Sequence, residues 1–148
     1  MESKALNISR IILIIITGIA LILGVILVFA PTFFITSEFE SFTGQALADF
    51  AESYPQAYSY ILLESSEMGV FLFAVALITL LIILIPYRKG EKWAWYAILI
   101  SVTLVAIATV GFNIPLGALD IILMSAILVV IDYVALAIGA KSILKKSV

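Results

Sequence analysis

The sequence predicts an all-α protein: a bundle of four transmembrane helices in antiparallel, up-and-down order, with a short amphipathic helix in the first outer loop. Of its 148 residues, 64% are hydrophobic and only 12% are charged, whereas soluble domains carry about 25% charged residues. Four apolar runs are long enough to cross a hydrocarbon core of about 30 Å. No other stretch is large enough for a separate soluble core, so we expect a single membrane domain over residues 1–148.

The four apolar runs cover residues 11–30, 60–86, 93–112 and 119–140. Inside a bilayer only helices and closed barrels satisfy their own backbone, and the alternation of period two that a barrel requires is missing, so we expect helices. The first run is longer than the apolar region of about 7–15 residues in a signal peptide. Its end at Phe29-Ala30-Pro31 lacks a cleavage pattern of small residues, so we expect a retained anchor.

The outer loop over residues 31–57 is predicted to contain a helix at about 37–53. Ser37 and Glu40 have the spacing of a capping box, and apolar residues recur after them at helical intervals. These residues are Phe39, Phe42, Ala46, Leu47 and Phe50. We expect this helix to lie on the outer membrane surface and to end near Tyr54-Pro55. Either it caps the bundle, or it gates a lateral entrance or docks a partner.

The basic residues predict the orientation. All eight fall on one side of the predicted spans: Lys4, Arg10, Arg88, Lys89, Lys92, Lys141, Lys145 and Lys146. Because inner loops carry the excess of Lys and Arg, this side is predicted to be cytoplasmic. We therefore expect a multi-pass protein of the plasma or cytoplasmic membrane with both termini in the cytoplasm.

The inner link Tyr87–Tyr96 reads YRKGEKWAWY and predicts a tight turn through Gly90. Its aromatic side chains, Tyr87, Trp93, Trp95 and Tyr96, are expected in the interfacial belt, and its bases, Arg88, Lys89 and Lys92, near lipid head groups. A specific site for anionic lipid is the alternative.

The second outer link is short, at residues 111–117, so the last two helices are predicted to be antiparallel neighbours. Small residues at Ala97/Ser101 and Ala135/Gly139 are candidates for close helix packing.

Three carboxylates are predicted at the outer boundary of the membrane. At 1.5 Å per residue, Glu67 lies about 30 Å from the inner end of its helix, Glu64 one turn further out, and Asp120 about 31 Å from Lys141. Acidic groups near a helix end are tolerated in water and favour the helix dipole. The alternative is a site for Ca²⁺ or another hard cation. That site requires the second and fourth transmembrane helices to be adjacent.

Asp132 is the one acidic residue predicted near the middle of the bilayer, about 13 Å from Lys141 along the helix. A charged Asp at this depth is unfavourable by at least about 2.5–3.5 kcal/mol on insertion scales. We therefore expect it to face the bundle interior or another subunit. The neutral partners available at a similar depth are Thr17, Ser101, Thr103, Ser125 and Tyr133. A buried hydrogen bond between helices and an interface or ligand contact are the two interpretations.

Composition excludes several function classes. The chain contains neither cysteine nor histidine, the usual protein ligands of haem, copper and zinc. No cofactor of its own and no catalytic constellation is predicted, so we do not expect an enzyme. The net charge of −2 offers no basic surface for nucleic acid. The predicted partners are other integral membrane subunits and membrane lipids.

Four helices with both termini inside, a structured first outer loop and the inner turn RKGEKWAW resemble small membrane families such as the DoxX-like proteins. The resemblance covers the whole chain through its organisation and implies a small subunit of a membrane oxidoreductase. The leading hypothesis is thus a non-catalytic accessory subunit of a respiratory or oxygenase-type complex. The alternatives are a homo-oligomeric cation or proton-coupled transporter that uses Asp132 and the outer carboxylates, and a binder of a lipid or quinone.

Overall fold

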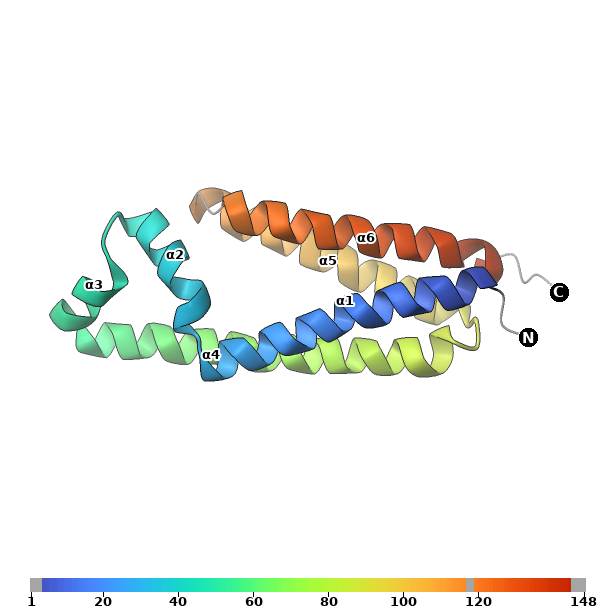
Figure 1. The fold of residues 1–148 in the computed structure, drawn as a ribbon, viewed down its shortest axis with the longest axis horizontal. Coiled ribbons are helices and arrows are strands. Elements are labelled where there is room, and N and C mark those ends of the chain that lie inside the picture. Colours follow the sequence, from blue (N-terminus) through green and yellow to red (C-terminus); the bar gives the residue numbers. More distant parts are fainter. Residues whose placement is uncertain (1–3, 117–118, 145–148) are drawn as a thin grey trace.

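The computed structural model describes residues 4–116 and 119–144, with side chains for residues 4–114 and 122–144. The helices in chain order are α1 (Lys4–Phe29), α2 (Thr32–Thr43), α3 (Leu47–Ser53), α4 (Pro55–Ile82), the π-helical turn η1 (Ile83–Tyr87), α5 (Lys92–Leu116) and α6 (Leu119–Leu144) (Figure 1). Helices α1, α5, α6 and the continuous α4–η1 segment are long and apolar enough to span a membrane. The described residues contain no strand, so the predicted all-α bundle with four spans is confirmed.

The spanning helices are longer than the apolar runs that predicted them. Helix α1 begins at Lys4 and α4 at Pro55, and α5 continues to Leu116, so most of the predicted outer turn at 111–117 is helical. The hydropathy of the sequence identifies only the apolar part of a helix, which lies in the hydrocarbon core. Backbone hydrogen bonding continues through the polar turns at the membrane surface, where side chains tolerate water.

The predicted outer helix at 37–53 is wrong in its start and in its continuity. The segment forms two helices, because Gly44 adopts a left-handed conformation with φ +69° and its N–H bonds to the carbonyl of Glu40 at 2.9 Å. Ser37 does not cap a helix but lies inside α2, where its hydroxyl donates to the Phe34 carbonyl at 3.4 Å. Helix α2 starts earlier, directly after Pro31, a residue that suits helix starts. Helix α3 ends at Ser53 as predicted.

Helix α1 is the centre of the bundle and packs against both α4 and α6, while α5 packs against α6. The remaining edge, between α4 and α5, has few direct contacts and is closed mainly where η1 meets α5. We call this end of the bundle, where α1 begins and α6 ends, the inner end and the opposite end the outer end, as names only. Figure 1 shows the four long helices gathered at the end that carries both termini and diverging toward α2 and α3. At the outer end α2 contacts α1, α3 and α5.

The buried core lies at the inner end of the bundle. Its members are Leu6, Leu13, Ile83, Tyr87, Ala94, Ile98, Ala135, Leu136 and Ile143. Trp95 adds a tie between α5 and α6, because its indole N–H donates to the Leu136 carbonyl at 2.9 Å. The inner end is therefore closed, while the helix pairs α1–α4 and α5–α6 diverge toward the other end (Figure 1).

Ser9, Tyr87, Ala135 and Gly139 form a polar contact inside this core, which we call the inner junction. The Ser9 hydroxyl donates to the Ala135 carbonyl at 2.6 Å and lies 2.6 Å from the Tyr87 hydroxyl. Since Ser9 has one hydroxyl hydrogen, Tyr87 donates to it. A Cβ on Gly139 would collide with the Tyr87 hydroxyl and lie 2.8 Å from Ser9 Oγ. Close packing at Ala135/Gly139 is thus confirmed, whereas the prediction of Tyr87 in the interfacial belt is wrong, because its side chain is buried.

Helices α1 and α4 cross with their backbones in contact. A Cβ on Gly24 would lie 2.8 Å from the Phe73 nitrogen, and a Cβ on Gly69 would lie 2.8 Å from the Val28 nitrogen. The Ser66 hydroxyl also donates to the Val28 carbonyl at 3.3 Å. Small residues let helices approach closely where the hydrophobic effect gives no net attraction between them, and here they hold α1 and α4 as one unit.

Candidate ligand-binding cleft

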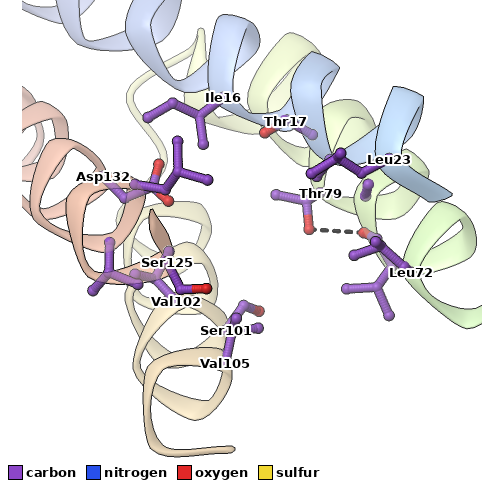
Figure 2. Close-up of a pocket in the computed structure, with 15 residues that line it drawn as sticks. Ile16, Thr17, Leu23, Leu72, Thr79, Ser101, Val102, Val105, Ser125 and Asp132 are labelled. Carbon is purple, nitrogen blue, oxygen red and sulfur yellow. Dashed lines mark hydrogen bonds between the residues drawn. The ribbon is translucent and has the colours of Figure 1, made fainter. Parts of the chain in front are cut away.

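A partly open cavity of about 220 Å³ lies between all four long helices, on the outer side of the inner junction (Figure 2). Most of its lining is aliphatic, including Ile16 and Leu23 from α1, Leu72 from α4 and Val102 from α5. Its polar members are Thr17, Thr79, Ser101, Ser125 and Asp132. An apolar cavity with a few polar groups is the usual form of a small-molecule site.

Asp132 faces the bundle interior and lines this cleft, with its carboxylate oxygens directed toward the open centre (Figure 2). The side chain is half-buried, and within the described part of the chain it has no hydrogen-bond or ion-pair partner. Of its predicted partners, Thr17, Ser101 and Ser125 line the same cleft.

The two other predicted partners of Asp132 do not line the cleft. Thr103 and Tyr133 instead lie 2.9 Å apart, hydroxyl to hydroxyl, in a hydrogen bond on the exposed side of α5 and α6. Because the Thr103 hydroxyl donates its one hydrogen to the Leu99 carbonyl at 2.8 Å, Tyr133 is the donor in this pair. The polar partners left near Asp132 are those of the cleft wall.

The cleft offers hydrogen-bond acceptors. The Thr79 hydroxyl donates its one hydrogen to the Val75 carbonyl at 2.8 Å, a bond that Figure 2 marks, so only its oxygen lone pairs face an occupant. An ionised carboxylate also only accepts, and the described lining residues include no Lys or Arg. The hydroxyls of Thr17, Ser101 and Ser125 can donate or accept, so the cleft offers two groups that only accept, Asp132 and Thr79, beside three that can do either.

The cleft opens toward lipid along the edge between α4 and α5. Val75 of α4 and Val105 of α5 both line the cleft, yet these residues are 51% and 52% exposed. These two helices have few direct contacts outside the η1 region. A molecule dissolved in the membrane can therefore reach the cleft without crossing the bundle.

The structure does not bring the outer carboxylates together within its described part. Glu64 and Glu67 are exposed on α4, and α1 lies between α4 and α6, since it packs against both. The side chain of Asp120 lies outside the described residues. Among the side chains that are described, no group of three His, Cys, Asp or Glu could hold a metal ion. The cation site stays a prediction.

At the inner turn, Arg88, Lys89 and Lys92 are exposed, and Trp93 is 55% exposed. This placement suits contact with lipid head groups. Trp95 is different, because it is half-buried and its N–H is used to bind α6. Its described contacts thus tie α5 to α6 instead of anchoring the bundle in the interface.

Sequence reasoning missed Thr79, Gly24 and Gly69. Thr79 is a single hydroxyl in an apolar run, as Thr17 is, and such isolated polar residues are the signal that could have placed α4 on the cleft. The glycines in apolar helices were a similar signal for the crossing of α1 and α4. Neither signal indicates its partner helix.

The fold and the cleft define a helical membrane protein with four spanning segments and an interior cavity open at one edge. Comparison with known proteins finds no matching family profile, no similar curated protein and no similar solved structure. The resemblance to the DoxX-like proteins therefore stays a prediction.

Proposed function

We propose that this protein binds a small, largely apolar molecule inside the membrane, in the cleft between α1, α4, α5 and α6. The observation that carries the proposal is an aliphatic cavity of about 220 Å³ that contains one carboxylate and is open to lipid at one edge. Pockets for drug-sized ligands measure about 300–1,000 Å³. The occupant is therefore small, or it is one end of a longer molecule such as a lipid.

Filling the mouth of the cleft is expected to abolish binding. Val105→Trp places a large ring at a position that lines the cleft, whereas Leu104→Trp places the same ring on a neighbouring position that does not line it and is 61% exposed. We expect n-hexanol to raise the thermal midpoint of the purified wild type and of Leu104→Trp in a saturable manner, because a ligand that binds only the folded state stabilises it. Val105→Trp should show no such rise.

The matched pair separates binding in the cleft from general effects of an alcohol on the detergent micelle. Equal shifts in Leu104→Trp and Val105→Trp would contradict the proposal. So would a wild type that n-hexanol does not stabilise at any concentration below its effect on the micelle.

We also propose that both termini and the turn between η1 and α5 face the cytoplasm, in the plasma or cytoplasmic membrane. The exposed bases Arg88, Lys89 and Lys92 support this orientation. Because the chain has no cysteine, a single cysteine introduced by substitution is the one site that a thiol reagent labels, and its labelling reports on which side of the membrane it lies. Ser53→Cys is expected to react with an impermeant maleimide in intact cells, and Lys89→Cys only after permeabilisation. The reverse pattern would overturn the orientation.

The position of Asp132 inside one bundle favours a ligand site over a transport path shared between identical subunits. Membership of a larger oxidoreductase complex as an accessory subunit stays a prediction. A membrane binder of a lipid would suit such a complex, because the cleft opens toward the lipid from which that molecule arrives. A quinone fits less well, because its carbonyl oxygens only accept hydrogen bonds, as the Asp132 carboxylate does.

A further inference from the structure

We infer that the molecule bound in the cleft is a hydrophobic amine, held with its ammonium group at Asp132 and its alkyl chain along the aliphatic wall. This inference rests on the proposed function and names the chemical class of the ligand. It follows from the charge of the cleft, the hydrogen-bonding capacity of its polar groups and its volume.

The charge of the cleft is uncompensated. Asp132 is its one ionisable lining residue and has no ionic partner within the described residues. The described bases lie at the inner end, on the first turns of α1, around Gly90 and at Lys141 of α6. A carboxylate in the low dielectric of a membrane is stabilised strongly by a cation at close range. Since the described part of the chain supplies none in the cleft, a ligand that carries one positive charge completes the site.

The carboxylate of Asp132 and the oxygen of Thr79 favour a ligand that donates hydrogen bonds, while the hydroxyls of Thr17, Ser101 and Ser125 can donate or accept. An ammonium group has three N–H donors and no acceptor, which complements the carboxylate of Asp132 and the free lone pairs on Thr79. A carboxylic acid ligand would meet like charge. An alcohol supplies a single donor and no charge, so it fills the cleft without neutralising Asp132.

The volume limits the buried part of the ligand. The cavity volume of about 220 Å³ is several times the roughly 30 Å³ that one water-sized group occupies in a liquid. n-Hexylamine, with six carbons and one nitrogen, matches this size. A longer alkyl chain would leave through the edge between α4 and α5, past Val75 and Val105, into the surrounding lipid.

The test compares three probes of equal chain length, n-hexylamine, n-hexanol and hexanoate, in thermal unfolding of the purified protein at neutral pH. We expect n-hexylamine near saturation to raise the midpoint of the wild type by about 5–10 °C, n-hexanol to raise it less, and hexanoate to have no effect. In Asp132→Asn, which keeps the size of the side chain but removes its charge, the amine and the alcohol should give equal shifts.

Glu67→Gln is the matched control, because it removes an exposed carboxylate from α4 away from the cleft. It should keep the preference of the wild type for the amine. Val105→Trp should respond to none of the three probes.

Each failure has its own signature. Equal shifts from amine and alcohol in the wild type, absent in Val105→Trp, would overturn the amine inference and leave the binding function in place. A preference for the amine that Asp132→Asn keeps, or that Glu67→Gln loses, would also overturn the amine inference. Shifts that Val105→Trp retains for every probe would overturn the binding function itself.

Discussion

Gly69→Val is expected to separate α1 from α4 and to destabilise the bundle by more than about 3 kcal/mol, at the upper end of the range for overpacked cores. The first added carbon would lie 2.8 Å from Leu27 Cβ and from the Val28 nitrogen and 2.9 Å from the Gly24 carbonyl oxygen. Two of these atoms are backbone, so no rotamer change relieves the collision. The helices have to move apart along their whole contact, and the hydrogen bond from Ser66 to the Val28 carbonyl is lost with it.

Gly18→Val is the matched control for this experiment. Gly18 lies on α1, as does Gly24 at the crossing with α4, but a Cβ at Gly18 would have nothing within 4 Å. Because Val has a slightly higher helix propensity than Gly, this variant should be neutral or more stable by about a few tenths of a kcal/mol. Unfolding in detergent by increasing fractions of sodium dodecyl sulfate measures both variants. Similar stability of the two would mean that the backbones of α1 and α4 are not in contact.

Gly139→Ala is expected to destabilise the protein by about 2–3 kcal/mol, because the added methyl group displaces the Tyr87 hydroxyl and leaves buried polar groups without partners. The new Cβ would overlap with that hydroxyl and press on Ser9 Oγ at 2.8 Å. The loss reaches both bonds of the inner junction, from Tyr87 to Ser9 and from Ser9 to Ala135. Gly111→Ala, at a position with nothing within 4 Å of its Cβ, is the control and should be neutral or slightly stabilising.

A double-mutant cycle identifies the cause. Tyr87→Phe alone removes the hydroxyl and is expected to be destabilising by about 1 kcal/mol. Because the ring without its hydroxyl leaves room for the methyl group, Gly139→Ala combined with Tyr87→Phe should be more stable than the sum of the single effects predicts, by at least about 1 kcal/mol. Additive effects in the cycle would show that the methyl group and the Tyr87 hydroxyl do not compete for the same space.

The parts of the fold that depend on the membrane could be predicted from the sequence. Long apolar runs identify spanning helices because the bilayer requires both apolar side chains and internal backbone hydrogen bonds. For the same reason, Asp132 could be predicted to face the interior. The helices of the outer segment were harder to predict, because two local patterns disagree. The capping-box spacing of Ser37 and Glu40 indicates a helix start, whereas Gly44 indicates a helix end. In the structure a helix ends at Gly44 and none starts at Ser37.

The residues of α4 and α5 that line the cleft with Asp132 could not be predicted. Whether Thr79 and Val105 stand opposite Asp132 depends on which helices become neighbours, and apolar surfaces all round each helix leave that undetermined. Small residues decide it instead, through contacts such as Gly69 against Val28 and Gly139 against Tyr87. These contacts join residues far apart in the chain, and one sequence alone does not reveal such pairs. Tyr87 shows the same effect, since an aromatic residue beside Arg88 and Lys89 has the local pattern of an interfacial anchor.

The inner junction also fixes when the protein can finish assembling during synthesis. Ser9 and its acceptor carbonyl at Ala135 are separated by 126 residues, so at about 5–20 residues per second a ribosome needs about 6–25 s to make the second after the first. Tyr87 is made partway through that interval, so its hydrogen bond to Ser9 does not require α6. The acceptor of the Ser9 hydroxyl does, so the last helix to be made completes the hydrogen bonding of one of the first residues.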